Sequence, residues 1–202
     1  MGIAESAEEP EEVAEGPESQ AVKLPVLCQR LVNRRNDVTY SVEMSAILDE
    51  SLEKFAITSS GTQVEVTVAE GRMLSLNADG KDITELYVRN SRGDTAILTI
   101  MDERGAYVGK VAQGLDGNDR MGLIFSYMQK PCAKISADNF SSLSIRILAM
   151  QEEAKDVVMA STSRKGNSLC IQVSKGYDGC ILLGILLGLL VLEPVLLQCG
   201  AG

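Results

Sequence analysis

Three arginines near the start of the chain are the residues whose type and spacing best fit a binding chemistry. Arg30, Arg34 and Arg35 lie within one stretch of six residues. A guanidinium group can donate two parallel hydrogen bonds to a phosphate, so this set could hold lipid head groups. The alternative is a strand end with ordinary solvated charges. A second basic set, residues 164–165 with Lys175, flanks the last apolar run of the alternating pattern.

The sequence lacks the residues that most hydrolases and zinc sites need. It contains no histidine, which excludes a Ser-His-Asp triad, a Cys-His pair and a histidine metal ligand. A faint calcium loop at residues 77–82 fails because Leu86 stands where the bidentate glutamate is required. The five cysteines show no Cys-x-x-Cys spacing, and no basic and apolar leader opens the chain. We therefore predict a cytosolic protein with reduced thiols, no enzymatic activity, no cofactor and no metal site.

Negative charge is concentrated at the start of the chain. Of the net charge of −9, residues 1–22 carry −7, from seven glutamates without a lysine or arginine. Such an acidic segment buries little apolar surface, so we predict that it is a disordered tail. The remaining residues carry only −2, which provides no electrostatic footprint for nucleic acid, and no nucleic-acid partner is expected.

Gly2 begins a pattern that fits N-myristoylation. Met1 precedes it, and Ser6 occupies the serine position of the pattern. The alternative is an unmodified, solvated N-terminus. A single myristoyl chain supports only reversible attachment, and the glutamates that follow would be repelled by an anionic leaflet. Stable attachment would therefore require a second contact from the folded domain.

The middle of the chain is dominated by alternating apolar and polar positions, the pattern of half-buried strands. The alternation is strict at residues 64–68, 143–147 and 169–173. Turn-forming sequences separate the runs, and several short strands at this spacing predict an all-β sandwich or barrel.

Residues 47–55 are the one helical-looking interlude in this region. Ile47, Leu48, Leu52 and Phe55 would fall on one face of a helix. The alternative is a loop over the rim of a barrel.

Residues 180–192 form thirteen consecutive uncharged, almost wholly aliphatic positions. A helix that is apolar all round must be enclosed by protein or by lipid. At about 1.5 Å per residue it spans roughly 20 Å, less than the ~30 Å hydrocarbon core of a bilayer. We therefore predict a helix over about 179–193 that fills the interior of a barrel, with Asp178 as its N-cap. The alternative is a membrane anchor, in which Gly184 and Gly188 would form a helix-dimerisation pair.

Two segments resemble the tubby-like superfamily, especially its LURP-one-related and phospholipid-scramblase branches. Residues 97–111 are similar to the family's Asp-x-x-Gly-x-x-[Ile/Val]-Gly hairpin, here at residues 102–109. Residues 169–192 combine a strand, a Gly-x-Asp turn and the aliphatic helix. The resemblance covers residues 23–197 in the order of elements. It implies a mainly β fold, a closed antiparallel β-barrel threaded by the C-terminal hydrophobic helix, followed by a short tail at 198–202.

The resemblance implies a lipid-associated or adaptor domain rather than an enzyme. No segment matches the basic residues through which tubby domains bind phosphoinositide head groups. Where scramblases have an acidic segment proposed to bind calcium, residues 167–173 contain no carboxylate. We predict a non-enzymatic lipid (phosphoinositide)-binding or adaptor module, cytoplasmic and peripheral at a membrane through N-terminal acylation, with membrane phospholipids and a protein as its possible classes of partner. The alternatives are a scramblase-type lipid transporter and a tail-anchored protein with a β-rich cytosolic domain.

Overall fold

The computed structural model describes most of the region that is predicted to fold. The described residues are 24–49, 51–69, 73–78, 85–90, 96–102, 104–115, 121–139, 143–150 and 157–192. The predicted acidic tail with Gly2 and the predicted short tail at 198–202 lie outside these residues.

Strands account for most of the described chain, which confirms the prediction of a mainly β fold. The strands are β1 (Val38–Glu43), β2 (Lys54–Ser59), β3 (Thr62–Ala69), β4 (Met73–Ala78), β5 (Glu85–Asn90), β6 (Ala96–Met101), β7 (Tyr107–Leu115), β8 (Met121–Tyr127), β9 (Lys130–Asn139), β10 (Ser144–Ala149), β11 (Val157–Lys165) and β12 (Ser168–Val173). The helical segments are the 3-10 helix η1 (Gln29–Leu31), α1 (Met44–Leu48), α2 (Gly179–Leu187) and the π-helix η3 (Gly188–Leu192).

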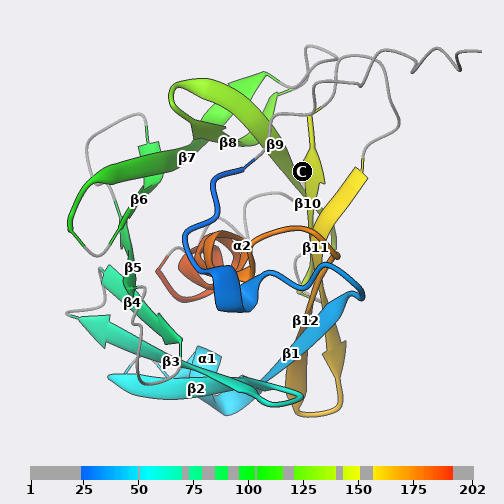
Figure 1. The fold of residues 1–202 in the computed structure, drawn as a ribbon. Coiled ribbons are helices and arrows are strands. Elements are labelled where there is room, and N and C mark those ends of the chain that lie inside the picture. The colour runs from blue at the N-terminus through cyan, green and yellow to red at the C-terminus, as the bar shows by residue number, and fades with distance from the viewer. Residues whose placement is uncertain are drawn as a thin grey trace, which may run out of the picture.

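The strands follow one another around a ring (Figure 1), and every pairing is antiparallel. Their order is β1-β12-β11-β10-β9-β8-β7-β6-β5-β4-β3-β2, which returns to β1. β1 pairs with β12 over six positions, from Val38 with Val173 to Glu43 with Ser168. On its other side β1 pairs with β2 at Ser41 and Thr58, so among the described residues this seam has the fewest paired positions of the ring.

Side chains alternate between the inside and the outside of the ring, as the sequence pattern predicts. In β3, Val64 and Val66 are completely buried, whereas Gln63 is exposed and Glu65 is half-buried. In β12, Leu169, Ile171 and Val173 are buried in the same way. Successive strand side chains point to opposite faces, so each strand supplies one apolar row to a single core. The predicted strands at 64–68 and 169–173 are confirmed.

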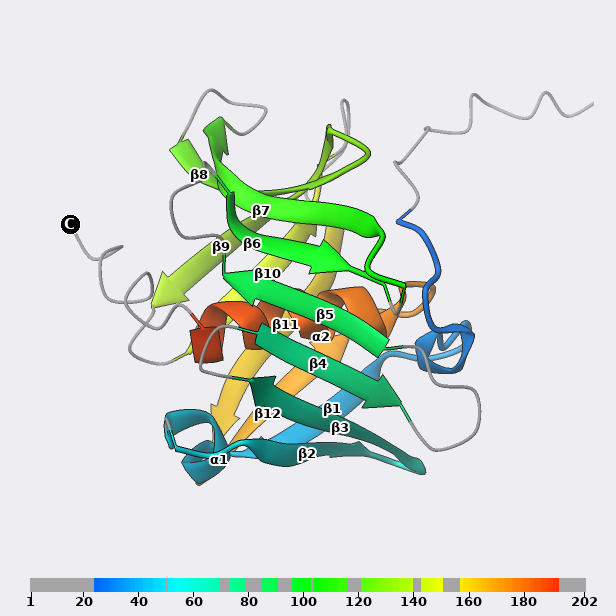
Figure 2. The same cartoon turned by 90° about the vertical axis from the view of Figure 1, so that its left-hand side faces the viewer.

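α2 and η3 form one continuous helical rod inside this ring (Figures 1 and 2), where α2 contacts β4, β5 and β12. Every residue of α2 is buried, which is why no polar position interrupts it. At Gly188, a Cβ atom would lie 2.8 Å from Cγ1 of Val88 and 2.9 Å from Cδ1 of Leu98. The glycine therefore lets the rod approach β5 and β6 more closely than any other residue could.

Of the two alternatives for residues 47–55, the helix is wrong. The structure has the short helix α1 at Met44–Leu48, and Phe55 belongs to strand β2, opposite Val66 of β3. Ile47 and Phe55 are both buried, but in different elements. Buried positions at helical spacing do not by themselves require a helix. Here the backbone of Phe55 pairs with β3 instead of continuing a helix from Ile47. The segment between α1 and β2 is a loop at the edge of the ring, which is the alternative that the sequence left open.

In the hairpin that carries the family resemblance, three positions of the motif have a clear structural role. Oδ1 of Asp102 accepts hydrogen bonds from the backbone N–H groups of Arg104, at 2.9 Å, and Ala106, at 2.8 Å. Gly105 has φ of +74°, a left-handed conformation that favours glycine. A Cβ atom at Gly109 would lie 2.5 Å from the backbone oxygen of Ser126. These positions build the β6–β7 connection and its packing.

We expect Gly109→Ala to lower the free energy of unfolding by about 2–3 kcal/mol, because overpacking beside a backbone atom cannot be relieved by a rotamer change. The new methyl group would also meet the ring of Phe125 at 2.7 Å. Gly122→Ala in β8 is the matched control, since nothing lies within 4 Å of its Cβ position. Chemical denaturation measures both. Equal effects of the two substitutions would contradict the close packing at Gly109.

Candidate functional site

The N-terminal described segment crosses the end of the ring at which α2 begins (Figure 1), and the buried side chain of Asp178 holds it there. Oδ2 of Asp178 accepts hydrogen bonds from the backbone N–H groups of Leu27, at 2.5 Å, and Cys28, at 2.8 Å. Oδ1 accepts from the N–H of Cys180 at 2.7 Å, so Asp178 is also the N-cap of α2. One carboxylate thus joins two segments that are 150 residues apart in sequence. We call this end, formed by residues 24–37 and 174–178, the Asp178 rim.

The interior of the Asp178 rim disfavours charge. Burial raises the pKa of Asp178, although its three N–H donors act in the opposite direction. Burial, with smaller contributions from Asp178 and two cysteines, raises the pKa of Tyr40 to about 12. Burial also raises the pKa of the Cys180 thiol well above its usual value. A buried thiol whose pKa is raised in this way forms little thiolate near neutral pH and is a poor nucleophile.

The raised pKa of Asp178 predicts a pH dependence of stability with a definite sign. Because the folded protein binds this proton more tightly than the unfolded chain, the associated stabilisation is fully present below the unfolded pKa and is lost as the pH rises through the folded pKa. Relative to Asp178→Asn, the wild type should gain stability as the pH falls from neutral towards about 4. Urea denaturation of both proteins across this range measures the difference. A difference that shrinks towards acid would contradict the burial of this carboxyl group.

Two exposed turns meet on the outer side of the Asp178 rim. The backbone N–H of Gly176 donates to the carbonyl oxygen of Asn33 at 2.7 Å, which joins the turn after η1 to the turn before α2. The side chain of Asn33 accepts from the N–H groups of Arg35, at 2.9 Å, and Asn36, at 3.2 Å. Oδ1 of Asp37 accepts from the N–H of Lys175 at 3.0 Å. These bonds hold the backbones of both turns in one arrangement.

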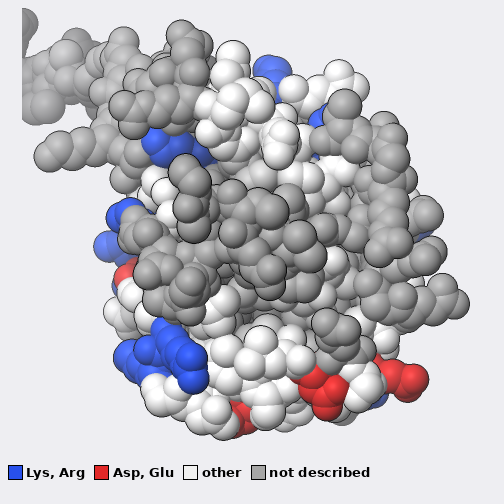
Figure 3. Space-filling model, turned by 180° about the vertical axis from the view of Figure 1, so that it is seen from behind, with Lys and Arg blue, Asp and Glu red and all other residues white. Residues whose placement is uncertain are grey.

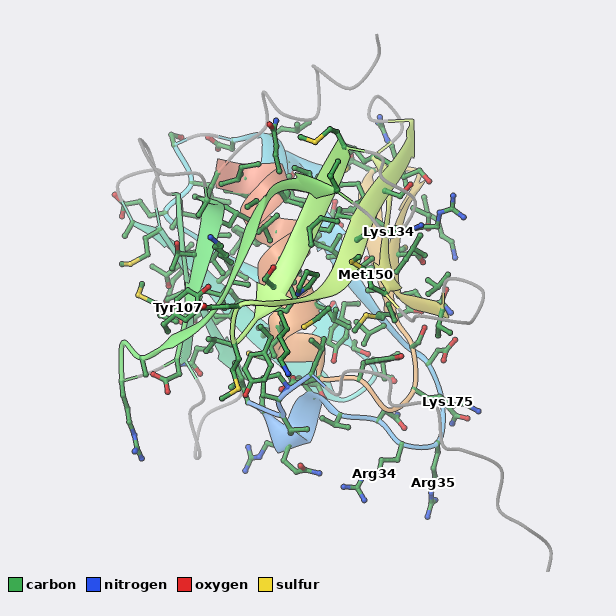
Figure 4. All side chains as sticks on the ribbon, turned by 90° about the horizontal axis from the view of Figure 1, so that it is seen from above. Arg34, Arg35, Tyr107, Lys134, Met150 and Lys175 are labelled. Atoms are coloured by element: carbon green, nitrogen blue, oxygen red, sulfur yellow. The ribbon has the colours of Figure 1, made fainter. Side chains whose placement is uncertain are left out.

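Arg34, Arg35 and Lys175 therefore project from neighbouring turns, and we call them the cationic cluster. All three are exposed, and Figure 4 shows their side chains at the same end of the molecule, pointing away from the ring. Within the described part of the chain, none of the three forms a salt bridge; Lys54 and Glu65 do so elsewhere, at 2.7 Å. The nearest acidic side chain in these turns, Asp37, already accepts hydrogen bonds from Lys175 N–H and from Gln172 at 2.9 Å.

The other basic residues singled out from the sequence are placed differently. Arg30 is exposed in η1 at the same rim, and it takes part in an intramolecular interaction. Residues 164–165 lie at the opposite end of the ring, because β11 and β12 run antiparallel between them and Lys175. The sequence grouped Lys175 with residues 164–165, whereas the fold places it beside Arg34 and Arg35. Spacing in the sequence could not reveal this, since Asn33 and Gly176 are distant along the chain.

The opposite end of the ring carries charges of both signs in separate places, as the view from behind shows (Figure 3). Arg164 and Lys165 are exposed at the end of β11, and Asp49 and Glu53 are exposed in the loop after α1. This end therefore lacks the predominance of positive charge that the cationic cluster gives to the Asp178 rim.

No family model, curated protein or solved structure matches this chain. Among the helices of the described ranges, none is both long and apolar enough to cross a membrane. The four described cysteines, Cys28, Cys132, Cys170 and Cys180, form no disulfide.

Proposed function

We propose that the protein is a non-enzymatic, membrane-associated module that binds the phosphates of anionic lipid head groups, phosphoinositides included, through Arg34, Arg35 and Lys175. In this proposal the sheet is a closed barrel of the tubby-like kind and α2 is its central core rather than a membrane anchor. The protein is cytoplasmic, and acylation at Gly2 supplies a first, reversible contact with the membrane. The cationic cluster supplies the second.

The observation that carries the proposal is the hydrogen bond from Gly176 N–H to the carbonyl oxygen of Asn33, which brings three exposed cations together. Two guanidinium groups and one ammonium group on fixed turns suit phosphate oxygens, because guanidinium groups can donate two parallel hydrogen bonds. The backbone of the site is already ordered, so binding would cost mainly the entropy of the three side chains. Residues 23–202 carry a net charge of only −2, so the attraction to an anionic membrane would come from this local cluster and not from net charge.

The burial of α2 favours this function over the alternatives. A tail anchor must expose its apolar surface to lipid, whereas every residue of α2 is buried within the protein. A transporter of the scramblase type would also need to expose the helix or open the ring. Lipid scrambling by the protein in reconstituted vesicles would favour the transporter over the proposed binding module.

Vesicle flotation tests the proposal. The wild type should float with phosphatidylcholine vesicles that contain phosphatidylserine or a phosphoinositide, and not with phosphatidylcholine alone. Binding should weaken steeply between low and physiological salt, as contacts between exposed charges do. Arg34→Glu with Arg35→Glu should reduce the affinity by about thirtyfold or more, since each surface cation contributes roughly 1 kcal/mol and the new carboxylates repel the membrane. Unchanged flotation of this double variant, with an unchanged melting temperature, would refute the proposal.

A further inference from the structure

We propose that the Asp178 rim faces the bilayer, and that the exposed valines around the cationic cluster, Val26, Val157 and Val158, enter the layer of lipid head groups. The inference rests on the proposed function and adds to it the orientation of the protein and an apolar contact. The partner to which it commits is an anionic phospholipid bilayer.

Val157 and Val158 lie beside Lys175 because of two hydrogen bonds from Ser174. The Ser174 hydroxyl donates to the carbonyl oxygen of Val158 at 2.7 Å. The backbone N–H of Ser174 donates to the carbonyl oxygen of Met159 at 2.9 Å. These bonds attach the start of β11 to Ser174, which directly precedes Lys175 of the cationic cluster. Val157 and Val158 are 39% and 37% exposed.

A β-bulge in β11 separates the two exposed valines from the buried part of the strand. Ala160 pairs with Ile147 of β10, but Val158 pairs with the next residue, Leu148, so Met159 is the additional residue of β11. Met159 and Ala160 are buried, whereas Val157 and Val158 are not. Bulges re-aim side chains and are common at functional edges of sheets. Here the bulge places Met159 and Ala160 together in the core, and Val157 and Val158 lie before it, beyond the end of β12, where they are exposed.

Val26 extends the apolar surface to the N-terminal segment. It is 51% exposed and precedes Leu27, whose N–H is bonded to Asp178. The rim thus presents apolar side chains from two distant parts of the chain, with Arg34, Arg35 and Lys175 among them. Cations beside exposed aliphatic groups match the interface of an anionic bilayer, where phosphates lie next to the first methylene groups.

The opposite end of the ring also exposes apolar residues, but its charge does not fit an anionic membrane. Leu115 and Met121, which pair at the ends of β7 and β8, are exposed there, as is Leu48 of α1. Asp49 and Glu53 lie in the loop directly after α1. The proposed orientation therefore has α2 running away from the membrane, with its N-terminal end close to the lipid. Residue 24, where the described chain begins, is on the membrane side.

Single tryptophans can test this orientation, because the natural sequence contains none. Val26→Trp places the fluorophore on the Asp178 rim, Val158→Trp places it beside the rim at the same end of the ring, and Leu115→Trp is the control at the opposite end. Each variant is mixed with vesicles of phosphatidylcholine and phosphatidylserine, with and without brominated acyl chains. We expect a blue shift and quenching by bromine for the two rim variants and neither change for Leu115→Trp. Thermal melting confirms that each variant is folded.

The outcomes separate the orientation from the proposed function. If the wild type floats but neither rim tryptophan is quenched, the cationic cluster binds lipid without insertion and this inference is wrong. Quenching at Leu115→Trp that equals quenching at Val158→Trp would also overturn it. If the wild type does not float with anionic vesicles at all, the proposed function fails as well. Having two rim variants keeps the test decisive where one substitution disturbs the fold.

Discussion

Gly188→Glu should prevent the protein from folding, with a loss of more than about 4 kcal/mol in the free energy of unfolding. Two costs combine at this position. The first is steric, because even a Cβ atom would lie 2.8 Å from Val88 and 2.9 Å from Leu98. The second is electrostatic, because the residue is buried in an apolar helical rod, where a carboxylate would lie among aliphatic side chains. The expected result is insoluble protein, or soluble protein without a cooperative transition.

Gly122→Glu is the matched control for this substitution. It makes the same chemical change in strand β8, where no atom lies within 4 Å of the Cβ position. The control should stay soluble and melt within a few degrees of the wild type, since its carboxylate can reach water. A cooperatively folded Gly188→Glu protein would mean that the rod is not enclosed by the strands.

Asp178→Ala should lower the free energy of unfolding by about 3 kcal/mol, because a single change removes the acceptor of three backbone N–H groups. The N–H of Cys180 loses its helix cap, and those of Leu27 and Cys28 lose the partner that holds residues 24–32 across the ring. Hydrogen exchange at these three amides should accelerate more than exchange in the strands. Asp178→Asn, which keeps one acceptor oxygen, should have a smaller effect.

Asp49→Ala is the control for the loss of an aspartate. Asp49 is exposed, and among the described residues its carboxylate accepts hydrogen bonds only from the backbone N–H and the hydroxyl of Ser51, at 2.9 and 2.6 Å. The substitution should change the free energy of unfolding by less than about 1 kcal/mol. If it costs as much as Asp178→Ala, the special role of Asp178 in joining the two segments would have to be abandoned.

Structural elements that depend on a short stretch of sequence could be predicted. The alternation at residues 64–68 and 169–173 determines which side chains face inwards, and the structure follows it. The apolar run after residue 179 and the aspartate before it are likewise local signals, and Asp178 lies at the N-cap of α2. The sequence left residues 47–55 open between a helix and a loop, because their apolar spacing suits a helix as well as a turn followed by a strand.

The candidate site could be predicted only in part. Arg34 and Arg35 are adjacent in sequence and were recognisable as a pair, but Lys175 joins them through a hydrogen bond between Asn33 and Gly176. That contact depends on the order of the whole sheet, since β1 must lie beside β12 before the two turns can meet. The exposure of Val157 and Val158 depends on β11 starting before the end of β12, because β12 pairs with β11 only from Ala160 onwards. The alternating pattern of the sequence does not show where one strand starts relative to its neighbour.

Comparing two double variants of equal charge change tests the central claim most directly. Arg34→Glu with Arg35→Glu alters the Asp178 rim, whereas Arg164→Glu with Lys165→Glu makes the same charge change at the opposite end of the ring. The affinity of each for vesicles that contain phosphatidylserine is measured by flotation at one salt concentration, with the wild type alongside. A local head-group site predicts that only the first pair abolishes binding and that the second retains most of it. Equal losses from both pairs would show that net charge alone governs the attraction, and would contradict a binding site at the Asp178 rim.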